Sequence, residues 1–183
     1  MTRQETGSPY DDRDVSEPAV HANVRALYDD GLEEVYGYLL HRCGDVSVAE
    51  DLTSETFLAA VAVLRKEPAP LNVAWLIGVA RHKLVDHWRR QERQQRALQA
   101  VEGAGADFTD PWPEHLDVLV ATRVLAQLGP HHRSALTLRY VDDLPVREVA
   151  RLLDRTEQAT EQLLARARVA FRNAYEKGGD DAH

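Results

Sequence analysis

The sequence predicts an all-α protein of two small helical domains joined by a flexible acidic linker. Apolar residues recur at three- and four-residue steps through most of the 183 residues, and neither strand-like alternation nor an internal repeat is present. Residues 97–116 have a different composition, with acids, two glycines and two prolines but no Lys or Arg. This change in composition marks a domain boundary.

The N-terminal half predicts a tail and three helices. Residues 1–20 lack periodicity and are expected to be a mobile tail, whereas residues 21–96 form the first domain. A first helix spans residues 21–43, with its two glycines as weak points, and a second, capped by Asp45 or Ser47, runs to Lys66. The segment "EPAPLN" then breaks the chain before a third helix over residues 73–97.

The C-terminal half predicts a four-helix domain over residues 117–176, followed by a tail over residues 177–183. Its helical segments are expected at residues 114–128, 131–141, 145–153 and 156–176. The last two, in "LPVREVARLLDRTEQATEQLLARAR", have the layout of a helix-turn-helix. Thr156 is the expected N-cap of the second of these helices, and Glu157 beside it favours the positive end of the helix dipole.

The last helix has one apolar and one polar face. Its polar face is acidic and amide-bearing at the N-terminal end and rich in arginine further on. That division suits a recognition helix whose first residues meet base edges while later ones hold phosphates. A solvent-exposed charged face with no DNA contact is the structural alternative.

Charge and composition exclude several classes of protein. The net charge of −8 argues against a protein that coats nucleic acid by itself. No apolar run is long enough to span a bilayer and no signal peptide is evident, so we expect a cytoplasmic protein. Cys43 is the single cysteine, and His41 near it completes only half a metal site, so no metal and no cofactor is expected. The scattered histidines and carboxylates form no catalytic motif, and an enzyme is not expected.

Two segments of the first domain differ in charge. Residues 81–96 carry six basic and two acidic side chains, with aromatic residues nearby, a composition that suits single-stranded nucleic acid. The preceding helix carries acids along its first half, while Leu52, Phe57, Leu58 and Val61 are expected to pack inward. An acidic face on a DNA-associated protein favours a basic protein partner, and a solvated face is the alternative.

The chain resembles bacterial sigma factors of the extracytoplasmic-function (ECF) group. The resemblance covers about residues 21–175 and depends on three segments in order. They are "DVSVAEDLTSETFLAA", similar to region 2.2; "AWLIGVARHKLVDHWRR", similar to regions 2.3 and 2.4; and "LAQLGPHHRSALTLRYVDDLPVREVARLL" with "LLARARVAFR", similar to region 4.

This resemblance implies binding to core RNA polymerase and to promoter DNA, with an anti-sigma factor as a further partner. The implied polymerase-binding residues are Asp45, Glu50, Asp51, Leu52, Glu55 and Phe57. Those implied for the minus-ten element, where the "PAPLN" loop would capture a flipped base, are Asn72, Trp75, Arg81, Lys83, Asp86, Arg89 and Arg90. Those implied for the minus-thirty-five element are Arg155, Thr156, Gln158, Glu161, Gln162, Arg166, Arg168 and Arg172.

The chain departs from the family pattern in its recognition helix. Where related sequences read like "GTVKSRLxRAR", this chain reads "QATEQLLARAR", so that Glu161 and Leu163 replace basic residues; His82 stands where Asn is usual. We interpret the altered helix as a changed specificity. The alternative function is a helix-turn-helix transcriptional regulator whose N-terminal domain senses a signal or dimerises.

Overall fold

A computed structural model describes residues 17–66, 69–98 and 117–180, with side chains described for 22–66, 69–95 and 117–177. Every regular element in these ranges is helical, which confirms the all-α prediction. Most of the predicted linker and the outer parts of both predicted tails lie outside the described residues.

The N-terminal domain consists of α1 (Glu17–Cys43), α2 (Val46–Lys66) and α3 (Val73–Leu98). The first helix begins at Glu17, so the predicted tail was too long by four residues. Helix α1 continues through Gly31 without a break. A Cβ at this position would lie 2.8 Å from Leu76 Cδ1 of α3, which is too close for an ordinary side chain. The glycine therefore permits α1 and α3 to approach closely. The buried core between the three helices includes Val35, Leu39, Leu52, Phe57, Leu76, Leu84 and Trp88.

The C-terminal domain contains α4 (Val118–Gln127), α5 (Pro130–Leu136), a π-helical turn η1 (Thr137–Val141), α6 (Val146–Leu153) and α7 (Glu157–Asp180). Asp154 caps the C-terminal end of α6 in a left-handed conformation, with a φ of 54°, and the Arg155 N–H donates to the Ala150 carbonyl at 2.9 Å. This arrangement satisfies a terminal carbonyl and turns the chain into α7. The domain core includes Val124, Leu136, Leu138, Val149, Leu163, Leu164 and Phe171.

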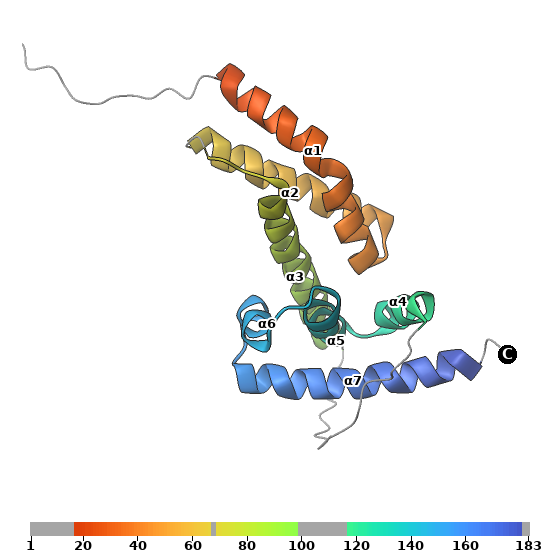
Figure 1. The fold of residues 1–183 in the computed structure, drawn as a ribbon. Helices are drawn as coiled ribbons and strands as arrows, with labels where there is room; N and C mark the ends of the chain where they lie inside the picture. Colours follow the sequence, from red (N-terminus) through yellow and green to blue (C-terminus); the bar gives the residue numbers. More distant parts are fainter. Residues whose placement is uncertain (1–16, 67–68, 99–116, 181–183) are drawn as a thin grey trace, which may run out of the picture.

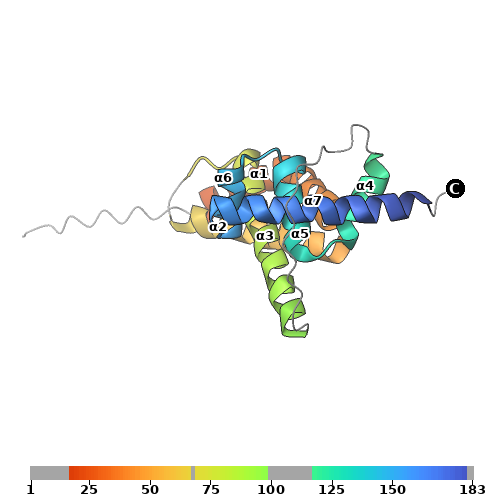
Figure 2. The ribbon, with the colours of Figure 1, turned by 90° about the horizontal axis from the view of Figure 1, so that it is seen from below.

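The two domains pack against each other through α3. This helix runs from the layer of α1 and α2 to α5 and α6, and α7 lies across the far side of the C-terminal domain (Figure 1). The same contact is visible from below, where the C-terminal end of α3 projects past α7 (Figure 2). Val85 of α3 is buried in the C-terminal core, so the two domains share apolar packing.

Candidate nucleic-acid and polymerase interfaces

A groove with a volume of about 350 Å³ opens where α3 begins. Asn72 forms one wall, and its side-chain Oδ1 accepts the Trp75 N–H at 2.9 Å, which caps the helix. The other lining residues are Asn23, Ala26, Leu27, Asp30, Leu64, Ala69, Pro70, Leu71 and Val73. The surface of the groove is about as polar as it is apolar, which suits a partly polar ligand. Trp75, which was predicted to act here, is not part of the lining and packs against the domain core instead.

The basic side chains of α3 are largely paired with carboxylates of the same chain. Lys83 Nζ lies 3.2 Å from Glu55 Oε2 of α2, and Arg81 Nε donates to Asp142 at 2.9 Å. Arg89 lies 3.9 Å from both Asp86 and Asp154, while Asp86 and Arg90 are themselves exposed. The predicted DNA-facing stripe is thus partly neutralised in this conformation.

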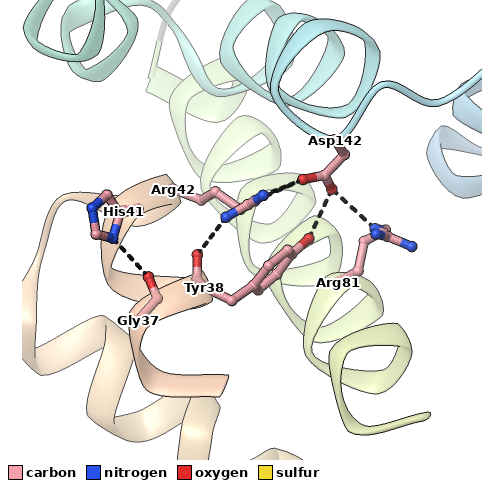
Figure 3. Close-up of polar contacts among 6 residues, drawn as sticks. All are labelled: Gly37, Tyr38, His41, Arg42, Arg81 and Asp142. Atoms are coloured by element: carbon pink, nitrogen blue, oxygen red, sulfur yellow. Dashed lines mark hydrogen bonds and ion pairs between the residues drawn. The ribbon is translucent and has the colours of Figure 1, made fainter. Parts of the chain in front are cut away.

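The Asp142 cluster, formed by Tyr38, Arg42, Arg81 and Asp142, joins the two domains. Their side chains point toward one another (Figure 3). The Asp142 side chain is only 1% exposed. Arg42 Nε donates to its Oδ1 at 2.7 Å, and Arg42 Nη2 forms an ion pair with the same oxygen at 2.6 Å. Tyr38 and Arg81 donate to Oδ2, at 2.8 Å and 2.9 Å. Three charge-assisted hydrogen bonds and the Arg42 ion pair satisfy both oxygens, which compensates for the burial of the charge.

The surroundings of Tyr38 fix the donors of this cluster. The Arg42 guanidinium carbon lies 3.7 Å from the Tyr38 ring centroid, and its Nη1 donates to the Tyr38 carbonyl at 3.0 Å. Burial, and then the neighbouring Asp142 charge, raise the pKa of the Tyr38 hydroxyl. Tyr38 therefore remains a proton donor to Asp142 at any physiological pH.

Two further contacts connect the domains beside this cluster. Arg133 of α5 donates from Nη2 to the Arg42 carbonyl at 2.7 Å, at the C-terminal end of α1. Arg155, just before the recognition helix, lies 3.6 Å from Glu92 of α3. The sequence offered no signal for these pairings, whose members are far apart in the chain.

The N-terminal half of α7 presents the predicted reading face to solvent. Thr156 caps the helix, since its Oγ1 accepts the Ala159 N–H at 3.1 Å, as the sequence predicted. Gln158, Glu161, Gln162 and Arg166 are exposed. Arg168 donates to the Tyr140 hydroxyl at 3.2 Å, and both Arg168 and Arg172 are half-buried.

The acidic face of α2 is exposed, but not all predicted docking residues lie on it. Asp45 accepts the Val48 N–H at 3.0 Å, and Glu50 and Asp51 are exposed. Leu52 and Phe57 are buried against α1 and α3, which leaves them no surface for a partner in this conformation. Leu58 was expected to pack inward, yet it is 67% exposed, and Val46 is also exposed.

Val46 lies four residues before Glu50 on α2 and Leu58 eight residues after it, and all three side chains are exposed. Neither apolar side chain was predicted from the sequence as a docking residue. The sequence could have indicated their exposure, because both fall outside the buried set of α2 that includes Leu52, Ala60 and Leu64.

The described residues provide neither a metal site nor a membrane span. No group of three or more His, Cys, Asp and Glu side chains is arranged to hold a metal ion in the part of the chain that the structure describes. None of the helices there combines the length and the apolar character needed to cross a bilayer.

Two packed helical domains, a basic helix beside a groove and a C-terminal helix-turn-helix define a DNA-associated transcription protein. Residues 27–94 match the family model "Sigma-70 region 2" and residues 119–171 match "Sigma-70, region 4". The chain belongs to the sigma-70 family, in its ECF group, and is a sigma factor that directs transcription initiation. The region 2 match over the first domain disfavours the alternative of a sensory or dimerising domain.

Two curated relatives and one solved structure illustrate the similarity. The ECF sigma factor SigM of Bacillus subtilis is 27% identical over 160 residues, which cover 86% of this chain and 98% of SigM. SigL of Mycobacterium tuberculosis is 33% identical over 125 residues, covering 65% of this chain and 70% of SigL. The sigma factor RpoE of Bartonella quintana, solved with the anti-sigma factor NepR, aligns with a TM-score of 0.49 at 18% identity, covering 85% of this chain and 96% of RpoE.

Proposed function

We propose that this sigma factor binds core RNA polymerase through α2, opens the minus-ten element with the first domain and reads the minus-thirty-five element with α7. The observation that carries the proposal is the groove at the start of α3, which lies directly ahead of the basic stripe on the same helix. A flipped base in the groove and phosphates along the helix would hold one unwound strand.

The polymerase surface would be the exposed face of α2. Glu50 and Asp51 supply negative charge, and Leu58 and Val46 supply apolar area on the same helix. An apolar centre with charges around it is the usual composition of a specific protein interface. We propose that the protein acts in the cytoplasm, and an anti-sigma factor remains a predicted partner.

Run-off transcription with purified core polymerase tests the proposal. Promoter-dependent initiation should require both the chain and core polymerase, while the chain alone should shift promoter DNA weakly in an electrophoretic assay. Absence of promoter-dependent initiation would overturn the proposal. Tight specific binding by the free chain would support the regulator alternative instead.

Docking by α2 has a matched control on α1. Reversal of Glu50 and Asp51 to Lys should weaken co-purification with core polymerase by roughly tenfold or more, because like charges at an interface are unfavourable. Reversal of Glu33 and Glu34, which are exposed on α1, makes the same change in net charge and should have little effect. Equal losses from both pairs would show that net charge, not α2, governs docking.

A further inference from the structure

The Asp142 carboxylate lies on the C-terminal domain, directly after η1. Among the described residues, every side chain that bonds it comes from α1 or α3 of the other domain. A carboxylate is rarely buried unless it is paired. The burial of Asp142 is therefore a property of the contact between the domains.

We propose that the Asp142 cluster holds the free chain in a closed conformation that cannot engage a promoter. The inference depends on the proposed function, because it assigns Arg81 to the minus-ten strand. In the closed conformation the Arg81 guanidinium donates to the Asp142 carboxylate. In the open conformation the same guanidinium would donate to a phosphate of the minus-ten strand. Carboxylate and phosphate oxygens use the same guanidinium donors, so the two interactions are mutually exclusive at that nitrogen.

The position of the recognition helix supports the same conclusion. Arg155, just before the recognition helix α7, lies 3.6 Å from Glu92 of α3. The start of α7 is therefore in contact with the helix that we propose binds the minus-ten strand. Two DNA elements one to two helical turns apart are separated by about 35 to 70 Å. We expect a promoter that holds its two elements this far apart to favour separation of Arg155 from Glu92, and with it separation of the two domains.

The contact has the chemistry of a reversible interface. Hydrogen bonds and ion pairs from Arg42, Arg81 and Arg133 provide most of the named contacts, and Val85 adds apolar packing. Polar interfaces between domains of one chain typically allow relative motion. Core polymerase and promoter DNA can therefore select the open conformation by binding it more tightly.

Two substitutions open the cluster without removing a predicted DNA contact. Asp142→Asn removes the shared carboxylate, and Arg42→Gln removes one of its three hydrogen bonds together with the Arg42 ion pair. Asp143→Asn is the matched control, because it makes the same change in net charge at the adjacent position, where the carboxylate is 98% exposed. Asn also tolerates the left-handed backbone of residue 143, whose φ is 52°.

The distance between the domains is measured by fluorescence energy transfer. Donor and acceptor dyes are attached at Ser54→Cys on α2 and Asn173→Cys on α7, both exposed positions, in a Cys43→Ser background. Wild type and Asp143→Asn should give high transfer, whereas Asp142→Asn and Arg42→Gln should lower it. Equal transfer in all four proteins would overturn the proposal.

Binding of the unlabelled proteins to a short single-stranded DNA of mixed sequence measures the functional effect. Loss of charge-assisted hydrogen bonds should increase the population of the open form, and with it the apparent affinity, by about 10- to 100-fold. Asp142→Asn and Arg42→Gln should both show this gain, and Asp143→Asn should stay within about twofold of wild type. Opening without a gain in affinity, or a gain shared by Asp143→Asn, would overturn the inhibitory role.

Energy transfer is read without polymerase or promoter, so the two proposals can fail separately. If Asp142→Asn opens the chain but run-off transcription fails for every protein, the proposed function is wrong. If run-off transcription succeeds and the chain never closes, only the Asp142 mechanism is wrong.

Discussion

Asn72 combines two roles that substitution can separate. Its side-chain carbonyl accepts the Trp75 N–H at 2.9 Å, and its amide also lines the groove at the start of α3. Asn72→Ala removes both functions, whereas Asn72→Ser keeps a capping oxygen and removes the amide. Loss of the cap should cost about 1 kcal/mol, which lowers Tm by roughly 2 to 4 °C in a chain of this length. The serine variant should melt close to wild type.

Transcription should respond differently from stability. An amide that pairs with a base edge contributes about 1 to 3 kcal/mol of discrimination, so both variants should lose roughly 5- to 150-fold in promoter-dependent initiation. Thermal melting and run-off transcription on the same preparations give the two readouts. If Asn72→Ser initiates as well as wild type, the amide does not read a base. If the serine variant melts as early as the alanine variant, the cap is not the stabilising contact.

Four further substitutions test other features. Gly31→Ala should lower Tm, because its Cβ would lie 2.8 Å from Leu76 and overpacking at about 1 to 3 kcal/mol exceeds the helix-propensity gain of about 1 kcal/mol. Gly37→Ala, with no atom within 4 Å of its Cβ, should raise Tm, and equal melting of the two variants would contradict the close approach of α1 and α3. Glu161→Lys should change which minus-thirty-five sequences are recovered in a promoter selection, because carboxylates accept from cytosine N4; an unchanged preference would exclude Glu161 as a reader. Arg166→Gln should weaken promoter binding at all sequences and reduce its salt slope by about 1, and an unchanged slope would place Arg166 away from phosphate.

Local chemistry made most of the helices predictable. Periodic apolar residues located the buried faces, and Thr156 and Asp45 act as helix caps, as their positions before apolar-periodic segments indicated. These features depend on neighbours within four residues, which the sequence displays directly. The prediction that Leu58 is buried was wrong, because it relied on the apolar character of the side chain. Leu58 follows the buried Phe57 directly and therefore points to the exposed side of the helix.

Contacts between distant segments were not predictable in the same way. Asp142 meets Arg42 across 100 residues and Arg81 across 61, and a pair of acids after an amphipathic helix does not identify such partners. The π-helical turn before Asp142 was also missed, because wider helical hydrogen bonding has no compositional signature. The sequence predicted two domains, but not that one would cover part of the other.

A carboxylate that closes its own chain differs from a separate inhibitor in stoichiometry. Asp142 is always present in a one-to-one ratio with the arginines that it binds, and a tethered group acts at a high effective concentration that dilution does not change. When a cell makes more sigma factor than inhibitory protein, the excess sigma factor is free of inhibition. The Asp142 contact cannot be outnumbered in this way, because every chain carries its own carboxylate. The fraction of open molecules should therefore be the same at low and high expression, and it should change only through binding of a third component such as polymerase.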